Sequence, residues 1–440
     1  MITIEDLYKL YLSHPIVSTD TRKLPEGCLF FALRGANFDG NKYAGAALEA
    51  GAAYAIIDEA DQLIDERTIL VPDALEALQL LAAHHRRALG IPVIAITGTN
   101  GKTTTKELTA AVLSQSYHLL YTEGNLNNHI GVPLTLLRLT PEHQLALIEM
   151  GASKPGDIAE LCAIAQPNYG LITNIGQAHL EGFGSLEGVR RTKGELYDSV
   201  RAREGILFYH EEDEVLRQMS LGTERISYGS SPKAYVQGVA SPSTGESLFL
   251  HFSWSCPILE MSAREVQTQL VGDYNLANAL AAIAIGLYFD VPSDKIDEAL
   301  TSYCPSNSRS QLIHSERGNQ IIADAYNANP SSMRTALSNF LAIEPALRPR
   351  IVILGDMNEL GASSHEAHQE LYQKLSSTTT PPIEIYLCGP HWREELGDQP
   401  QVYPNVEELI AHIEAHPITK SLILVKGSNS IHLGKLLPYL

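Results

Sequence analysis

VIAITGTNGKTTT, residues 93–105, is the stretch of this 440-residue chain that indicates its fold most directly. The β-branched run 93–97 predicts a buried strand, and a helix is expected from about Thr103 to Ser114. Between them, Gly98 and Gly101 allow backbone N–H groups to turn toward an anion at the positive end of the helix dipole. A strand, a glycine-rich loop and a helix in this order predict a phosphate-binding loop in an α/β sheet.

The residue types in this loop indicate a nucleoside triphosphate. Lys102 is placed to neutralise the β- and γ-phosphates of ATP, and the Thr103 hydroxyl is a ligand for Mg²⁺. The general pattern of such loops has a glycine five residues before Gly101, where this chain has Ile96. The alternative is a glycine-rich turn that binds no ligand. The flanking strand and helix make this alternative less favoured. The predicted ATP-binding residues of the loop are Gly98, Thr99, Asn100, Gly101, Lys102, Thr103 and Thr104.

Strand and helix patterns alternate on both sides of the loop and predict an α/β fold in three domains. Residues 1–91 hold short apolar segments between turns, which is typical of a small α/β domain. Residues 92–305 are expected to form a central parallel-sheet domain around the phosphate-binding loop. Residues 306–440 follow a segment of linker composition and predict a C-terminal Rossmann-like α/β domain, with ligands beyond the carboxyl ends of its strands. The segment 241–247 is predicted to be a surface hairpin or loop, and 376–382 a polar loop.

Length, charge and cysteine content exclude several other classes of protein. At roughly 150 residues per domain, the length fits about three domains. With 32 basic and 51 acidic residues the net charge is −19, which argues against binding nucleic acid or an anionic membrane non-specifically. The five cysteines are scattered without a C-x-x-C pair, which suits a reducing cytoplasm. No signal peptide is evident, and the most apolar stretch, 274–289, fits a core helix better than a membrane span.

Three further patterns suggest metal or substrate contacts. Glu149 ends an apolar strand, where a carboxylate commonly holds the Mg²⁺ of a nucleotide, although an exposed acid after a strand is the alternative. Asn127 and Asn128 are predicted to bind substrate, but they suit a turn equally well. The run His365-Glu366-Ala367-His368 is one residue short of H-E-x-x-H, so a solvated helix face is favoured over a metal site.

Several segments together resemble the Mur ligase superfamily, whose members join a carboxylate to an amine with cleavage of ATP. GTNGKTTT at 98–105 is a shortened phosphate-binding loop similar to theirs, and GNLNNHIGVP at 124–133 resembles their GNxNNxIGxP segment. TNIGQAHL at 173–180 matches TNIGxAHL, and TKGE at 192–195 resembles A-K-G-E with threonine in place of alanine. GDYNLAN at 272–278 resembles GxxNxxN. The motifs occur in the family's order over nearly the whole chain.

The resemblance implies roles that the patterns alone leave undecided. In the family the histidine is a metal ligand and the lysine carries a carbamate, which implies a second Mg²⁺ at His179 and Lys193. On pattern alone, His179 would be a structural hydrogen-bonding residue and Lys193 a solvated, protonated lysine. Asn275 and Asn278 are implied to line the adenine pocket. The implied catalytic residues are Lys102, Lys193 and His179, and the implied metal ligands are Thr103, Glu149, His179 and Lys193.

The third and first domains indicate a branch of the family. DAYNANP at 324–330 and LGDMNELG at 354–361 resemble the members that add D-alanyl-D-alanine, and DNPR, usual in the sibling that adds the third amino acid, is absent. TDTR at 19–22 and ALRGANFDG at 32–40 resemble a uridine-nucleotide domain, with a turn and a surface ion pair as the alternative for Asp20 and Arg22. The residues implied to close the third domain over the nucleotide are Arg309, Asp324, Tyr326, Asn327 and Asn329. The substrate-binding residues so indicated are Asp20, Thr21, Arg22, Arg34, Gly35, Asn37, Phe38, Asp39, Gly40, Asn127 and Asn128.

The resemblance therefore implies a cytoplasmic, monomeric, ATP-dependent amide ligase of peptidoglycan precursor synthesis with two Mg²⁺ ions. Its substrates would be UDP-N-acetylmuramoyl tripeptide and D-Ala-D-Ala, joined through an acyl phosphate, with no nucleic-acid partner and no membrane insertion. Two alternatives stay open. One is the sibling ligase that adds the third amino acid, and the other is a nucleotide-binding scaffold without catalysis.

Overall fold

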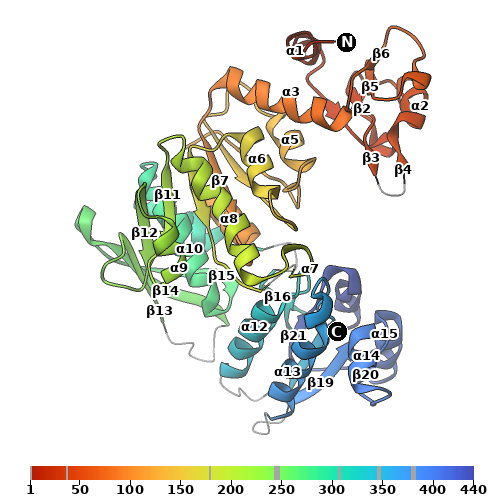
Figure 1. Ribbon diagram of the computed structural model, residues 1–440. Coiled ribbons are helices and arrows are strands. Elements are labelled where there is room, and N and C mark those ends of the chain that lie inside the picture. Colours follow the sequence, from red (N-terminus) through yellow and green to blue (C-terminus); the bar gives the residue numbers. More distant parts are fainter. Residues whose placement is uncertain are drawn as a thin grey trace.

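Three main sheets follow one another along the chain and form three lobes (Figure 1). The computed structural model describes residues 2–35, 38–177, 180–241, 248–305, 309–343, 348–377 and 383–440. The N-terminal lobe, drawn in red to orange, and the C-terminal lobe, drawn in blue, each adjoin the central lobe. Strands and helices alternate through most of all three, which confirms the predicted α/β class.

The N-terminal lobe has a four-stranded parallel sheet in the order β1-β2-β5-β6, and a short β3–β4 hairpin. Helix α3 begins at Asp73, whose side chain accepts the Glu76 backbone N–H, and ends at Gly90 in the left-handed conformation. The elements are α1 (Ile4–Ser13), β1 (Val17–Ser18), β2 (Leu29–Phe31), β3 (Arg34–Gly35), β4 (Phe38–Asp39), α2 (Ala44–Glu49), β5 (Tyr54–Ile57), β6 (Thr68–Leu70) and α3 (Ala74–Leu89).

Helix α3 connects this lobe to the central one through a shared core. Its buried Leu78 belongs to one apolar cluster that contains side chains of both sheets. Arg86, near its end, is 8% exposed and donates to Ala165 O at 2.9 Å, Gln166 O at 3.0 Å and Asn168 Oδ1 at 2.9 Å. The first lobe is therefore held against the central lobe by both apolar and polar contacts.

The central lobe has a nine-stranded sheet in the order β15-β14-β13-β12-β11-β10-β7-β9-β8. Strands β7 to β13 pair in parallel as predicted, whereas β14 and β15 add an antiparallel edge that was not predicted. Of the predicted hairpin or loop at 241–247, residues 242–247 lie outside the described residues. The strands are β7 (Val93–Thr97), β8 (Leu119–Tyr121), β9 (Leu145–Glu149), β10 (Tyr169–Ile172), β11 (Ile206–His210), β12 (Glu224–Gly229), β13 (Val236–Ala240), β14 (Phe249–Cys256) and β15 (Met261–Val271).

Helices cover this sheet, and two of them carry the predicted nucleotide residues. Helix α10 is buried from Ala279 to Gly286 and packs on α4, which confirms the expected core helix. Within the described ranges, no helix combines the length and apolar content that crossing a bilayer requires. The helices are α4 (Lys102–Leu113), α5 (Gly131–Leu136), α6 (Asp157–Ala165), α7 (Leu180–Phe183), α8 (Leu186–Arg201), α9 (Glu214–Met219), α10 (Leu276–Tyr288) and α11 (Ser293–Ser302).

The C-terminal lobe has a six-stranded sheet in the order β16-β17-β21-β18-β19-β20, parallel except at β16. Two separate apolar clusters cover its faces. Of the predicted polar loop at 376–382, residues 378–382 lie outside the described residues. The elements are β16 (Gln311–His314), β17 (Gln320–Asp324), α12 (Pro330–Ala342), β18 (Arg350–Gly355), α13 (Ser364–Ser376), β19 (Ile383–Cys388), α14 (Pro390–Leu396), β20 (Val402–Tyr403), α15 (Val406–Ala415) and β21 (Leu422–Lys426).

Candidate active site

The predicted phosphate-binding loop lies between β7 and α4, and two of its positions admit only glycine. Gly98 has φ 143°, and a Cβ there would lie 2.0 Å from Thr173 Oγ1. Gly101 has φ 79°, and a Cβ there would lie 2.6 Å from Asn278 Oδ1. The tight approach of these neighbours explains why the loop needs both glycines.

The amine of Lys102 turns back onto this loop. Its Nζ donates to the backbone oxygens of Gly98 at 2.8 Å and Thr99 at 3.0 Å. Burial lowers the pKa of Lys102 to about 8; the nearby Glu149 carboxylate opposes this shift and the Arg309 charge adds to it. A polyphosphate bound beside the loop would favour the charged amine again, because an opposite charge stabilises it.

Glu149 ends β9 beside the start of α4 and is 1% exposed. Its Oε1 accepts from Thr103 Oγ1 at 3.2 Å and from Asn127 Nδ2 at 2.7 Å. No donor among the described residues reaches its buried Oε2. The remaining carboxylate oxygen and the neighbouring Thr103 hydroxyl are oxygen ligands of the kind that Mg²⁺ prefers. Asn128, by contrast, caps the following turn by accepting from the Ile130 and Gly131 backbone N–H groups.

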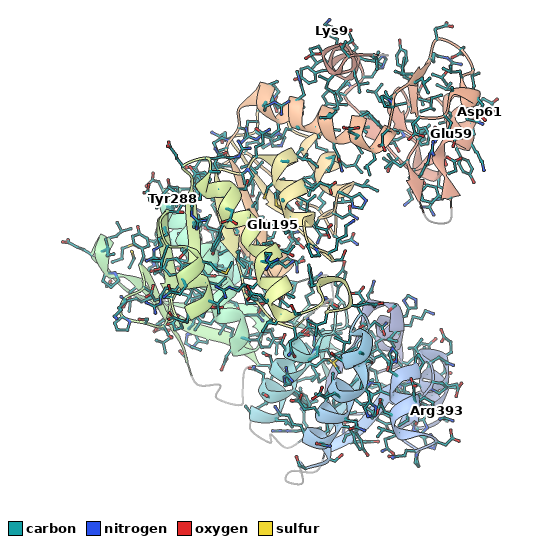
Figure 2. All side chains as sticks on the ribbon, in the orientation of Figure 1. Lys9, Glu59, Asp61, Glu195, Tyr288 and Arg393 are labelled. Atoms are coloured by element: carbon teal, nitrogen blue, oxygen red, sulfur yellow. The ribbon has the colours of Figure 1, made fainter. Side chains whose placement is uncertain are left out.

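Lys193 lies in α8 and is 3% exposed, so it is not the solvated lysine that the charge pattern alone would suggest. Its Nζ lies 5.6 Å from the centre of the Phe183 ring. Burial lowers the pKa of Lys193 to about 7, and the charge of Lys102 adds to this effect against the opposing Asp157 and Glu195. Glu195, labelled in Figure 2, accepts from the backbone N–H groups at the start of α6. His179 lies outside the described residues.

Asn278 of helix α10 and Asn275, the residue that precedes this helix, lie beside the phosphate-binding loop. Asn278 Oδ1 accepts from Thr105 Oγ1 at 3.0 Å, and Asn278 Nδ2 donates to Asn275 Oδ1 at 3.0 Å. Asn275 is 1% exposed and donates to Val271 O. These contacts fix both amides at the base of the candidate nucleotide site.

The third domain contributes an ion pair and a stacked pair. In the parallel register of β17 and β21, Asp324 lies opposite Lys426, and Lys426 Nζ is 2.6 Å from Asp324 Oδ2. The Arg309 guanidinium stacks on the Tyr326 ring, 3.8 Å from its centre. Both pairs lie at the carboxyl edge of the third sheet, where open α/β sheets bind ligands.

One cleft of about 670 Å³ lies between the central and third domains. The predicted residues that line it are Thr99, Asn100, Gly101, Lys102, Thr103, Thr104, Asn127, Asn128, Glu149, Asn275, Asn278, Arg309, Asp324, Tyr326 and Asn327. Gly98, Lys193 and Asn329 do not line it, although Asn329 contacts Asn100 at its edge. Sequence reasoning missed Lys426, Tyr274, Ser331 and Thr335, which also line the cleft. Of these, Lys426 had a usable signal, because it ends an apolar strand.

Of the substrate residues predicted in the first domain, those that the structure describes do not line this cleft. Asp20 accepts from the Arg22 guanidinium in an exposed pair, the geometry of a turn with a surface ion pair. Arg34 Nη2 lies 2.7 Å from Asp58 Oδ1, and Phe38 is 56% exposed. Asn37 lies outside the described residues. The structure places Thr21 in the turn after Asp20, and Gly35, Asp39 and Gly40 around the β3–β4 hairpin.

The solvated helix face predicted at 365–368 is wrong for His368, which is fully buried in α13. Its Nε2 accepts from the Met357 N–H at 3.1 Å, and its Nδ1 donates to Ser364 O at 2.7 Å. Burial lowers the pKa of His368, consistent with a neutral ring that supports the loop at 356–361. His365 is exposed as expected, and within the described ranges no group of three His, Cys, Asp or Glu could hold a metal.

Family models match the chain in three consecutive parts. Residues 15–86 match the Mur ligase family catalytic domain, 96–286 the Mur ligase middle domain, and 308–429 the Mur ligase glutamate ligase domain. Among curated relatives, the UDP-N-acetylmuramoyl-tripeptide–D-alanyl-D-alanine ligase of Escherichia coli K12 is 39% identical, over 94% of this chain and 91% of the relative. The Bacillus subtilis protein of the same name is 33% identical, over 96% and 92%.

Solved structures agree with these matches. MurF from Acinetobacter baumannii superposes with a TM-score of 0.83 at 31% identity, covering 96% of this chain and 92% of that chain. The MurF ligase of Thermotoga maritima in complex with ADP superposes with a TM-score of 0.84 at 25% identity, covering 97% of each chain.

Proposed function

This chain belongs to the Mur ligase family, and from that premise we propose that it is the ATP-dependent ligase that joins D-alanyl-D-alanine to UDP-N-acetylmuramoyl tripeptide. The products are the pentapeptide precursor of peptidoglycan, ADP and phosphate. The observation that carries this function is that Lys102 and Glu149 face one cleft whose opposite wall is the third domain. A phosphoryl-transfer site enclosed between two domains suits a reaction whose intermediate must be kept from water.

In the proposed reaction, the terminal carboxylate of the tripeptide attacks the γ-phosphate of ATP and forms an acyl phosphate as ADP leaves. The amino group of D-Ala-D-Ala then attacks the acyl carbon, and the tetrahedral intermediate expels phosphate. Lys102 neutralises the β- and γ-phosphates, since phosphoryl transfer needs positioning and charge neutralisation more than covalent help. Asn275 and Asn278 bind near the adenine, while Arg309, Asp324, Tyr326 and Asn327 complete the site from the third domain.

Magnesium ions supply electrostatic stabilisation of the phosphates in this chemistry. Thr103 and Glu149 Oε2, an oxygen that no donor in the described part of the chain reaches, are suited to hold one ion. For a second ion we propose His179 and a carbamate on Lys193. The lowered pKa of Lys193 supports this modification, because only the neutral amine can add to CO₂, releasing one proton as the carbamate forms.

Membership of the family also suggests substrate contacts, domain boundaries, an oligomeric state and a location. We propose that Asp20, Thr21, Arg22, Arg34, Gly35, Asn37, Phe38, Asp39 and Gly40 bind the uridine nucleotide, and that Asn127 and Asn128 contact the peptide end of the substrate. We also propose domain boundaries at 91/92 and 305/306, a monomer, and a cytoplasmic location.

The decisive experiment measures phosphate release with ATP, UDP-N-acetylmuramoyl tripeptide and D-Ala-D-Ala, and reads the product mass in parallel. A product heavier than the tripeptide substrate by the dipeptide less water, formed only with both substrates, would establish the proposal. Turnover only with the dipeptide precursor and a diamino acid would indicate the sibling reaction. ATP binding without either product would indicate a scaffold.

A further inference from the structure

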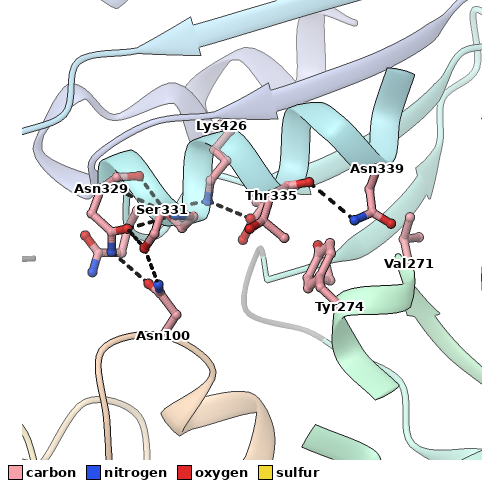
Figure 3. A network of polar contacts seen from close by, with 12 residues as sticks. Asn100, Val271, Tyr274, Asn329, Ser331, Thr335, Asn339 and Lys426 are labelled. Carbon is pink, nitrogen blue, oxygen red and sulfur yellow. Dashed lines mark hydrogen bonds and ion pairs between the residues drawn. The ribbon is translucent and has the colours of Figure 1, made fainter. Parts of the chain in front are cut away.

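The side chain of Asn100, in the middle of the phosphate-binding loop, hydrogen-bonds to the third domain at both ends of its amide. Its Nδ2 donates to Ser331 Oγ at 2.8 Å, and its Oδ1 accepts from Asn329 Nδ2 at 2.7 Å (Figure 3). Asn329 is the N-cap residue of α12, and Ser331 lies in the first turn of that helix. These two bonds exist only while the third domain lies against the loop.

The backbone of Asn100 is held by the central domain instead. Its N–H donates to Asn174 Oδ1 at 2.9 Å, and its carbonyl oxygen accepts from Thr173 Oγ1 at 2.6 Å and Asn174 Nδ2 at 2.9 Å. The main chain of the loop is thus braced independently of α12, and the side-chain amide is what connects it to the other domain.

On the third-domain side of the contact, the side chain of Asn329 is also held in place. Asn329 is 3% exposed, and its Oδ1 accepts from the Ser332 N–H to cap α12 while its Nδ2 is directed at Asn100. Each of these hydrogen bonds adds a modest net stabilisation to the docked arrangement, because an intramolecular hydrogen bond slightly outweighs the bonds to water that it replaces. Farther along α12, Asn339 Oδ1 accepts the Asp273 N–H of the central domain at 3.2 Å.

We propose that Asn100, Asn329 and Ser331 form a docking contact that positions the third domain on the phosphate-binding loop and couples this docking to nucleotide affinity. They are positioning residues. The cleft has walls from both domains, including Lys102 on one side and Tyr326 on the other. A nucleotide that touches both walls favours the docked arrangement, and by linkage the loss of the docking contact weakens nucleotide binding. The inference rests on the proposed binding of ATP in this cleft.

Asn329→Ser tests the contact without removing the helix cap. Serine caps helices well but is too short to reach Asn100. The matched control is Asn405→Ser, because Asn405 caps α15 of the same domain by accepting the Glu408 N–H and is exposed. Ser331→Ala removes the second hydrogen bond to Asn100 and also the 2.8 Å bond that Ser331 Oγ donates to Asn329 Oδ1, while the Ser332 N–H still caps α12.

The full chain is measured by small-angle scattering without nucleotide and by calorimetry with a non-hydrolysable ATP analogue. We expect Asn329→Ser and Ser331→Ala to have a larger radius of gyration and about 3- to 10-fold weaker analogue binding, as the loss of one hydrogen bond implies. Asn405→Ser should have the same radius of gyration and analogue affinity as the unaltered chain. In all three variants, the KM for the UDP-linked substrate should not change. An unchanged radius and unchanged affinity in both variants would overturn the docking contact. If the unaltered chain binds no analogue, the proposed function fails, and the radius of gyration alone then decides the docking contact.

Discussion

Asn127 Nδ2 lies 2.7 Å from Glu149 Oε1, while no donor among the described residues reaches Glu149 Oε2. The amide therefore holds one oxygen of a buried carboxylate and leaves the other available to coordinate a cation. The sequence predicts that Asn127 binds substrate, and its hydrogen bond adds a second role, which is to orient the Glu149 carboxylate. Groups that orient a metal ligand commonly affect metal affinity as strongly as some ligands do.

Removing this amide should weaken Mg²⁺ binding. We expect Asn127→Ala to raise the Mg²⁺ concentration for half-maximal phosphate release by about 10-fold or more, because Glu149 loses its orientation. Asn125→Ala is the control, since Asn125 is exposed in the same loop. An unchanged Mg²⁺ requirement in Asn127→Ala would show that Glu149 is held by other means.

Lys102→Met should lose turnover although the chain still folds. We expect turnover to fall by at least about 100-fold, because a charged donor to the transferring phosphate is lost. Lys9→Met, at an exposed lysine of α1, should leave turnover unchanged. Retained activity in Lys102→Met would contradict the assignment of the phosphate-binding loop.

The same variant should change the pH dependence of stability. Burial lowers the pKa of Lys102 to about 8 from an ordinary 10.5, so the folded chain binds this proton less tightly than the unfolded chain. The charged amine therefore opposes folding at pH 7, and this opposition fades as the pH rises from about 8 to 10.5. Lys102→Met should be more stable to urea at pH 7, with the difference shrinking toward pH 10.5.

The phosphate-binding loop could be predicted from sequence because its determinants are local. Strand, glycines, lysine and helix are contiguous, and each constrains the backbone of its neighbours. Lys426 could not be placed in the same way, because it meets Asp324 only through the parallel pairing of β17 and β21, which are distant in sequence. The burial of His368 was hidden for a similar reason, since α14 and the loop after β18 cover a helix whose own composition is polar.

Lys193 should respond to bicarbonate and pH together. Burial, aided by the charge of Lys102, lowers its pKa to about 7, so the neutral amine prevails at pH 8 and is depleted at pH 6. If the carbamate forms, protein depleted of CO₂ at pH 6 should lose activity and regain it with bicarbonate at pH 8. Lys193→Ala should be inactive and partly rescued by short carboxylic acids, whereas Lys154→Ala, at an exposed loop lysine, should remain active. Full activity of Lys193→Ala without rescue would refute the carbamate.

Arg86 should stabilise the interface between the first and central domains. Methionine can retain the apolar stem, but it leaves Ala165 O, Gln166 O and Asn168 Oδ1 without the guanidinium that now donates to all three. Asn168 Oδ1 keeps the Val93 N–H, but the buried Ala165 O loses its charged donor, so we expect Arg86→Met to lower the free energy of unfolding by about 2–4 kcal/mol. Arg87→Met is the matched control, because Arg87 is the next residue of α3 and is exposed. Since surface substitutions usually change stability by less than about 0.5 kcal/mol, the two variants should differ clearly in their urea midpoints. Equal midpoints would mean that the apolar core around Leu78 holds this interface alone.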